Sequence, residues 1–282
     1  MINSESSAQP GNYTDRFFES LASGSYASAK EIIPIVIERV NPLRVVDVGC
    51  GTGEWLSVCA DFGISDYLGI DGSWIDLNQL RIPSEYFLEW NLTEPIVLNK
   101  QFDLVISLEV GEHIPEKYAE TFVESLTKLG HAVLFSAAVP KQGGNGHVNE
   151  RWPEYWAGLF EKRRYVVIDC VRKIVWKNQK VSWWYAQNTF LYLSESVLSR
   201  YPVLEKEYRM TNKSQLTLIH PNLFIKKASG HDKYKATLKH RSIVKTIRVI
   251  NKFPPGLQHR LRPLVNTLER QRKFLLHDVS WP

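Results

Sequence analysis

Short apolar runs recur along the first half of the chain, and segments with helical spacing of apolar residues fall between most of them. The runs lie near residues 44–48, 67–71, 86–90, 102–107 and 131–137. Residues 28–40 show the intervening helical pattern, which ends at Asn41-Pro42. Such alternation predicts right-handed crossovers and a parallel sheet, with a ligand crevice at the carboxyl ends of the strands.

Two further β-rich runs follow at residues 165–175 and 183–193, joined by the polar stretch 177–180. We expect them to pair as an antiparallel hairpin at the end of the sheet. Gln187 and Asn188 interrupt the second run with polar side chains. These amides need hydrogen-bond partners if they are buried, and either a neighbouring loop or a substrate could supply them.

The first strand ends in a loop with glycine at every second position. Gly49, Gly51 and Gly53 precede a helical pattern that begins near Glu54. Closely spaced glycines let the backbone turn sharply and approach a ligand, and the free N–H groups of a helix start attract an anion. The spacing is shorter than the G-x-G-x-x-G of dinucleotide sites, so no pyrophosphate need be accommodated. The carboxylate at the methionine end of S-adenosylmethionine fits the same place.

The second strand ends in an acid, Asp71, which is followed by Gly72. A carboxylate at this position can hydrogen-bond both hydroxyls of an adenosine ribose. Together, the glycine loop and this acid predict a site for a nucleoside cofactor.

These motifs resemble the class I S-adenosylmethionine-dependent methyltransferases over roughly residues 13 to 195. The resemblance implies a Rossmann-like α/β fold with a seven-stranded, mostly parallel sheet that ends in a β-hairpin. It places Asn91 against the adenine amino group, and it places the end of the run 102–110 beside the reacting methyl. The cofactor-binding residues that we expect are Asp47, Gly49, Cys50, Gly51, Gly53, Asp71, Gly72, Asn91, Leu92 and Leu108.

Within that superfamily, Ser136–Pro140 followed by Gly143–Glu150 is similar to a bacterial and phage group often associated with surface-glycan genes. The group's other marks are Tyr13, Phe17-Phe18, Ser28-Ala29, Tyr155-Trp156, Trp184-Tyr185 and Gln187-Asn188. The resemblance implies an O-methyltransferase that acts on a sugar hydroxyl of a glycan or a glycan precursor.

Methylation of an alcohol requires a group that removes or weakens the hydroxyl proton, either a general base or a metal ion. Glu109, Glu112 and His113 form an E-x-x-E-H motif directly after the fourth strand, and His147 follows the fifth strand in a glycine-rich loop. We expect His147 and Glu109 to be catalytic, with His147 as the base. The alternative for His147 is that it anchors its loop.

The same side chains are similar to the metal site of small-RNA 2'-O-methyltransferases, in which two glutamates and two histidines hold a divalent ion. Metal ligation by Glu109, Glu112, His113 and His147 would favour Mg²⁺, Mn²⁺ or Fe²⁺ over structural zinc. Metal-free members of the superfamily also carry the motif, where it packs the turn, so both interpretations stand.

A length of 282 residues with 44% hydrophobic content is ample for one large core. The three cysteines, Cys50, Cys59 and Cys170, are too few and too scattered for a disulfide framework. The N-terminus lacks an apolar signal segment, and no window approaches the roughly 18 apolar residues of a membrane span. We therefore expect a cytoplasmic protein with reduced thiols.

Charge is unevenly distributed along the chain. Residues 226–282 hold 14 Lys and Arg and 3 Asp and Glu, a net of +11, whereas residues 1–225 net −6 within the total of +5. We divide the chain into a disordered N-terminus (1–12), a methyltransferase domain (13–225) and a basic amphipathic helical tail (226–282).

On a helix, the tail places its basic and apolar residues on different faces. The basic stripe is Arg241, Lys245, Arg248 and Lys252, and the apolar face holds Ile243, Val244, Ile247 and Ile250, before Pro254-Pro255 stops the pattern. Leu257, Leu261, Leu264 and Leu268 repeat beyond that stop, where Pro263 could bend the helix. The apolar faces either pack on the domain or a second subunit, or attach the protein to the anionic inner face of the membrane.

Three functions are consistent with this sequence. The leading interpretation is a sugar O-methyltransferase whose acceptor is a small molecule or a glycan. The second is an RNA 2'-O-methyltransferase with a divalent metal, which the net −6 of residues 1–225 opposes because it would repel a phosphate backbone. The third is a non-catalytic cofactor-binding scaffold, which the intact Asp47, Glu109 and His147 argue against.

Overall fold

The computed structural model describes the backbone of residues 15–277 and the side chains of residues 24–229 and 238–272. Residues 1–12, for which we predict disorder, and Tyr13 lie outside the described residues, as do the side chains of Phe17 and Phe18. The chain divides into two compact units, Met1–His220 and Pro221–Pro282, and each is considered by itself.

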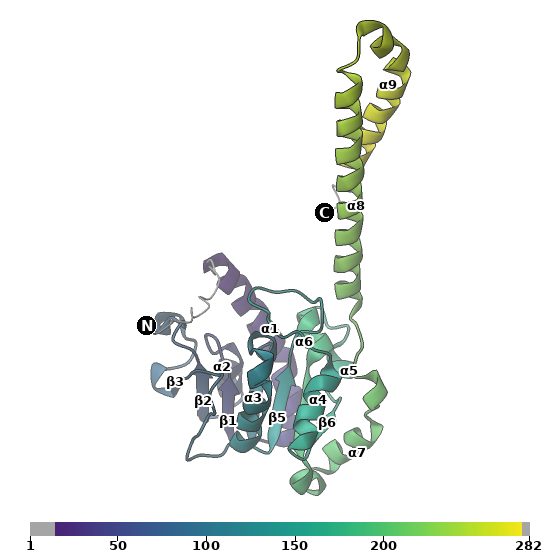
Figure 1. Ribbon diagram of the computed structural model, residues 1–282. Coiled ribbons are helices and arrows are strands. Elements are labelled where there is room, and N and C mark those ends of the chain that lie inside the picture. Colours follow the sequence, from purple (N-terminus) through teal and green to yellow (C-terminus); the bar gives the residue numbers. More distant parts are fainter. Residues whose placement is uncertain (1–14, 278–282) are drawn as a thin grey trace, which may run out of the picture. The chain divides into compact units, whose positions relative to one another are not determined.

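A seven-stranded sheet with the order β3-β2-β1-β4-β5-β7-β6 forms the centre of the first unit (Figure 1). Its strands are β1 (Arg44–Val48), β2 (Asp66–Asp71), β3 (Phe87–Glu89), β4 (Leu104–Leu108), β5 (Ala132–Ser136), β6 (Tyr165–Ile168) and β7 (Phe190–Ser194). Strands β1 to β5 run parallel, and β7 lies antiparallel between β5 and β6. The predicted α/β fold with a mostly parallel sheet and an antiparallel terminal pair is confirmed.

Helices cover both faces of this sheet (Figure 1), because alternate residues of each strand point to opposite sides. On β1, Val45 joins the apolar cluster that α1 and α2 complete, whereas Val46 joins the cluster that α3 and α4 complete. The helices are α1 (Asp15–Val40), α2 (Glu54–Asp61), α3 (Glu116–Leu129), α4 (Pro153–Lys162), α5 (Arg172–Val175), α6 (Trp183–Asn188) and α7 (Pro202–Met210). Short 3-10 helices are η1 (Leu77–Gln79), η2 (Ser84–Tyr86), η3 (Gly111–His113), η4 (Glu195–Arg200) and η5 (Lys213–Gln215).

The predicted antiparallel pairing of the β-rich runs 165–175 and 183–193 is confirmed by β6 and β7, but each run is a strand only in part. Only the beginning of the first run and the end of the second are strands, β6 and β7, and the chain between them forms α5 and α6. Gln187 and Asn188 therefore lie on α6 rather than on a strand.

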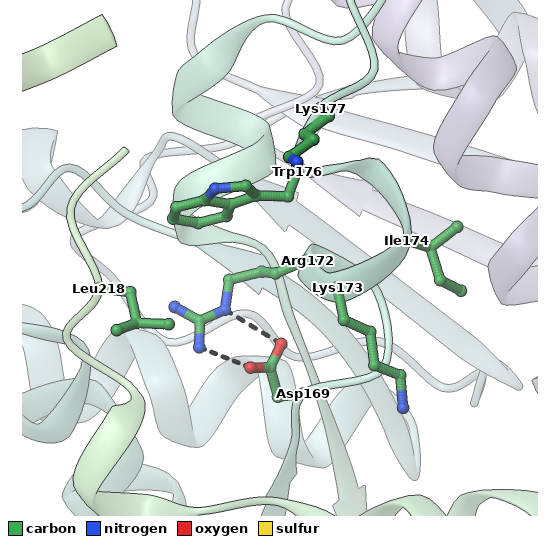
Figure 2. Close-up of a pocket in the computed structure, with 7 residues that line it drawn as sticks. All are labelled: Asp169, Arg172, Lys173, Ile174, Trp176, Lys177 and Leu218. Carbon is green, nitrogen blue, oxygen red and sulfur yellow. Dashed lines mark hydrogen bonds and ion pairs between the residues drawn. The ribbon is translucent and has the colours of Figure 1, made fainter. Parts of the chain in front are cut away.

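The turn of the chain at α5 depends on Arg172, whose side chain is 2% exposed. Its guanidinium forms two hydrogen bonds with the Asp169 carboxylate, of 3.0 and 2.6 Å (Figure 2). It also donates to the backbone carbonyls of Gln187, Gln215 and Leu216. A buried cation needs all of these acceptors, so tertiary contacts override the β propensity of the local sequence.

The second unit consists of α8 (Pro221–Ile250) and α9 (Pro255–His277), which contact each other. The chain turns between Ile250 and Pro255, where the sequence predicts a stop at Pro254-Pro255. Pro263 lies within α9. No helix in the described part of the chain is long and apolar enough to span a bilayer.

Candidate active site

The predicted functional residues lie where parallel strands end. The glycine loop follows β1, Asp71 ends β2, Asn91 comes after β3, and Glu109 follows β4. His147 lies in the segment between β5 and α4. The carboxyl edge of the sheet therefore carries the groups that the sequence singles out, as the crevice rule for α/β sheets predicts.

The glycine loop needs glycine for conformational reasons. Gly49, Gly51 and Gly53 have φ angles of 83°, 55° and 86°, in the left-handed region that other residues rarely adopt. A Cβ on Gly49 would lie 2.3 Å from Cγ2 of Val110, whereas a Cβ on Gly51 would meet nothing within 4 Å. The space beside Gly51 is thus open to a ligand that approaches the backbone.

Asp71 links the end of β2 to this loop. Its carboxylate accepts hydrogen bonds from the backbone N–H groups of Gly51 and Gly72, both 2.7 Å long. Burial raises the pKa of Asp71, and these two bonds oppose that rise. Each carboxylate oxygen has a second lone pair, so the side chain can accept from ribose hydroxyls while it holds the loop.

Asp47, on β1, is a buried carboxyl with an unsatisfied oxygen. The residue is 1% exposed, and its Oδ2 has no hydrogen-bond partner among the described residues. Burial and the charges of Asp71 and Glu54 raise its pKa well above the ordinary value. A buried acid of this kind beside an open glycine cradle fits the ammonium group at the methionine end of S-adenosylmethionine.

The other expected cofactor residues differ in their surroundings. Cys50, Leu92 and Leu108 are buried, and burial raises the pKa of the Cys50 thiol well above its ordinary value, so the thiol packs rather than reacts. The Asn91 side chain is exposed and forms a local turn, in which its Oδ1 accepts from the N–H and hydroxyl of Thr93. Its contact with adenine stays a prediction.

Glu109 is held by two amide side chains that the sequence reasoning did not assign to it. Its oxygens accept from Gln142 Nε2 at 2.8 Å and from Asn188 Nδ2 at 3.1 Å. Its backbone has a φ of 56°, which is unusual for a residue with a side chain. Its N–H is directed at Ser136, 3.0 Å from both the carbonyl oxygen and the hydroxyl. Burial raises the pKa of Glu109, and the bonds from the amides and Ser136 oppose that rise.

The buried amides form one chain of hydrogen bonds. Asn188 Nδ2 also donates to Gln142 Oε1 at 2.9 Å, and Gln187 Nε2 donates to Asn188 Oδ1 at 2.9 Å. The backbone N–H of His220 donates to Gln187 Oε1 at 2.8 Å. Neighbouring segments of the protein therefore supply the partners that Gln187 and Asn188 need, and the chain fixes the orientation of the groups around Glu109.

Glu112 is completely buried on η3. Its carboxylate oxygens form no well-aligned hydrogen bond with a described residue, although the Glu109 side chain and the backbone of Ala138 lie close to them. Burial and the nearby charge of Glu109 raise the pKa of Glu112 well above its ordinary value. Its backbone carbonyl accepts from the N–H groups of Val148 and Asn149, both at 2.9 Å, which fastens the histidine loop to η3.

The orientation of His147 depends on Glu150, to which the sequence reasoning assigned no role. His147 Nδ1 lies 2.9 Å from Glu150 Oε1. Glu150 also accepts from the backbone N–H groups of Lys141 and Gly143. Burial raises the pKa of Glu150, but the bonds from His147 and the two N–H groups outweigh it, so that the pKa lies below its ordinary value. An ionised Glu150 only accepts, so Nδ1 of His147 donates this hydrogen bond, and in the neutral imidazole Nε2 is then the nitrogen that keeps its lone pair.

Three of the four predicted metal ligands converge. Single donor atoms of Glu112, His113 and His147 all lie within 4.8 Å of one another, and His147 Nε2 is 3.9 Å from Glu112 Oε1. The two imidazole rings meet edge to face, with centroids 5.0 Å apart. Glu109 lies outside this group, with its carboxylate on Gln142 and Asn188. One carboxylate and two imidazoles form a donor set that could hold a divalent transition metal.

Residues 13–181 match the family described as methyltransferase domain. The match spans more than half of the chain, so the chain belongs to this family. It is an S-adenosylmethionine-dependent methyltransferase, which confirms the predicted enzyme class and cofactor.

The fold is similar to several solved methyltransferases. DesVI from Streptomyces venezuelae is 14% identical, with a TM-score of 0.49, and the similarity covers 64% of this chain and 96% of that one. The sugar N-methyltransferase KedS8 from Streptoalloteichus sp. ATCC 53650 is 13% identical, with a TM-score of 0.48 and coverage of 69% and 99%. Magnesium protoporphyrin IX methyltransferase from Synechocystis PCC 6803 with bound SAM is 15% identical, with a TM-score of 0.42 and coverage of 66% and 87%. A search of curated protein sequences gave no significant match.

Proposed function

We propose that the protein is an O-methyltransferase that acts on a sugar hydroxyl of a glycan or glycan precursor, with His147 as the general base. The observation that carries this proposal is the 2.9 Å contact between His147 and Glu150, which leaves Nε2 free to take a proton. An alcohol must lose its proton during attack, whereas a neutral amine already has a lone pair. A histidine held in this way therefore favours an oxygen acceptor.

S-adenosylmethionine, when bound, supplies a methyl group on a positively charged sulfur. The protein's part begins with binding: Asp71 accepts from the ribose hydroxyls, Asp47 pairs with the ammonium, and the glycine loop lets the backbone come close. His147 Nε2 then takes the hydroxyl proton as the acceptor oxygen attacks, and Glu150 stabilises the resulting imidazolium. The amides of Gln142 and Asn188 keep Glu109 in place beside the acceptor.

The choice of a sugar rests on the aromatic residues near the histidine loop and on the resemblance to the surface-glycan group. Trp152 immediately precedes α4 and is 44% exposed, whereas Trp156, within α4, is buried in the core. An exposed indole has a flat apolar face and a polar N–H, and both suit a sugar ring and its hydroxyls.

The convergence of Glu112, His113 and His147 supports a second version of the reaction, in which these side chains hold a divalent metal that lowers the pKa of the acceptor hydroxyl. With Glu109 outside the cluster, two imidazoles and one carboxylate favour Mn²⁺ or Fe²⁺ over Mg²⁺. The same cluster keeps RNA 2'-O-methylation as a second candidate function. Chelation tests the metal version: activity should fall in chelator and return with Mn²⁺, whereas full activity in chelator would contradict it.

Transfer of labelled methyl from S-adenosylmethionine tests the substrate class. We expect incorporation into nucleotide sugars or lipid-linked glycans and none into RNA. The product should be stable to conditions that hydrolyse methyl esters, because an ether is formed. Incorporation into RNA alone, or into an amino group of the sugar, would contradict the proposal.

A further inference from the structure

The second unit is a helical hairpin with a basic outer surface. Between Pro221 and His277 the sequence contains two acids, Asp232 and Glu269, against 14 lysines and arginines. Such an excess of one charge on two packed helices is not needed for helix formation and repels itself. It therefore indicates an anionic partner.

The apolar face of α8 is used within the hairpin. Ile250 is 5% exposed, and Ile243, Val244 and Ile247 are half-buried. On α9, Leu261, Val265 and Leu268 are likewise half-buried, and the two helices contact each other (Figure 1). This apolar face therefore packs on the neighbouring helix, a surface other than the methyltransferase domain or second subunit that the sequence suggested.

The basic stripe faces away from this contact. At about 100° per residue, Arg241, Lys245 and Arg248 lie on the side of α8 roughly opposite Ile247, and Lys252 follows in the turn after the helix. All four are exposed, and none of them forms an ion pair with a described residue.

Apolar side chains accompany the basic stripe on the exposed surface. Leu238 and Val249 fall on the same side of α8, beside Lys245, and are 46% and 54% exposed. On α9, Leu257 and Leu264 are 43% and 47% exposed. A surface that combines cations with large aliphatic groups suits the boundary between lipid headgroups and acyl chains, where both find a favourable environment.

We infer that the basic stripe and its flanking Leu238 and Val249 bind an anionic lipid surface. A nucleic acid would also attract the cations, but its phosphates and sugars would leave the aliphatic side chains without an apolar environment. The lipid surface satisfies both, through headgroup phosphates and shallow insertion of the leucine and valine. The attachment concerns the second unit, so it is independent of the acceptor proposed for the first.

Vesicle co-sedimentation of the full-length protein tests this inference. The protein should bind vesicles of phosphatidylcholine mixed with phosphatidylglycerol, and binding should weaken as salt is added, because exposed charges are screened. Vesicles of phosphatidylcholine alone should bind little. A full-length variant with Arg241→Gln, Lys245→Gln, Arg248→Gln and Lys252→Gln should lose about a hundredfold or more in affinity.

A charge-matched control separates the stripe from net charge. Lys117→Gln, Lys162→Gln, Lys177→Gln and Lys206→Gln remove the same charge from exposed positions of the first unit and should leave vesicle binding nearly unchanged. Leu238→Ser with Val249→Ser should weaken binding while the salt dependence is kept. All variants should bind S-adenosylmethionine as the unchanged protein does.

Three results would overturn the inference. The first is equal binding to neutral and anionic vesicles, or no binding to either. The second is an equal loss in the stripe variant and the control variant, which would leave only net charge. The third is binding of a single-stranded RNA that exceeds vesicle binding and is lost in the stripe variant, which would assign the surface to nucleic acid.

Discussion

Individual side chains at the carboxyl edge of the sheet divide into those that the sequence predicts and those that only contacts reveal. The alternating glycines and Asp71 can be recognised from local rules. A left-handed turn favours glycine, and an acid at the end of the second strand lies where a ribose is bound. The roles of Glu150, Gln142 and Asn188 cannot be recognised in this way, since each depends on distances between separate segments. For Glu150 alone the sequence holds a signal, because it is an acid three residues after His147 at the end of the glycine-rich loop.

Asp71→Asn should weaken S-adenosylmethionine binding by about tenfold to a hundredfold, because a charged acceptor for the ribose and the loop is lost. Calorimetric titration of the folded variant measures this loss. Asp66→Asn, at the opposite end of the same strand, should bind the cofactor like the unchanged protein. Normal affinity in Asp71→Asn would remove this carboxylate from the site.

Asp47 should make stability depend on pH. Its pKa is raised in the folded state, so the native protein retains a proton that the unfolded chain has released. The contribution of this group to the free energy of unfolding therefore falls as the pH rises above 3.8, the ordinary pKa of an aspartate. It continues to fall until the pH reaches the pKa of Asp47 in the folded state. Asp47→Asn should flatten that decline in urea-unfolding measurements across pH while weakening cofactor binding. An unchanged slope would contradict a buried, raised Asp47.

Among elements, the strands and crossovers of the sheet follow from hydrophobic periodicity, whereas α5 and α6 do not. The residues of α6 include Trp183, Trp184 and Tyr185, whose propensity favours a strand. Hydrogen bonds from Arg172 to three carbonyls outside α5 decide their conformation. A local pattern cannot contain that information, because the acceptors come from distant parts of the chain.

Arg172→Met tests this explanation of α5 and α6. The substitution keeps an unbranched apolar stem but leaves Asp169 and the three carbonyls without their donor, which should cost about 3–5 kcal/mol in the free energy of unfolding. Urea denaturation measures the change. Lys173→Met, on the exposed side of the same short helix, should change stability by less than about 1 kcal/mol. Equal effects of the two substitutions would contradict a structural role for Arg172.

At the scale of the whole molecule, the chain combines an acidic catalytic unit with a basic helical hairpin. The sequence predicts both parts through composition and charge, because these properties do not depend on contacts. It does not predict that the two tail helices cover each other's apolar faces. If the hairpin serves attachment alone, turnover on a water-soluble acceptor should be the same in the stripe variant and the unchanged protein.

We propose that His147, oriented by Glu150, removes the proton of a hydroxyl acceptor. The direct measurement is single-turnover methyl transfer to the glycan acceptor by His147→Ala, with S-adenosylmethionine binding measured in parallel. We expect normal cofactor binding, a rate lower by roughly 10²- to 10⁴-fold and partial rescue by added imidazole, with a smaller loss in Glu150→Gln. An unchanged rate in His147→Ala would contradict it.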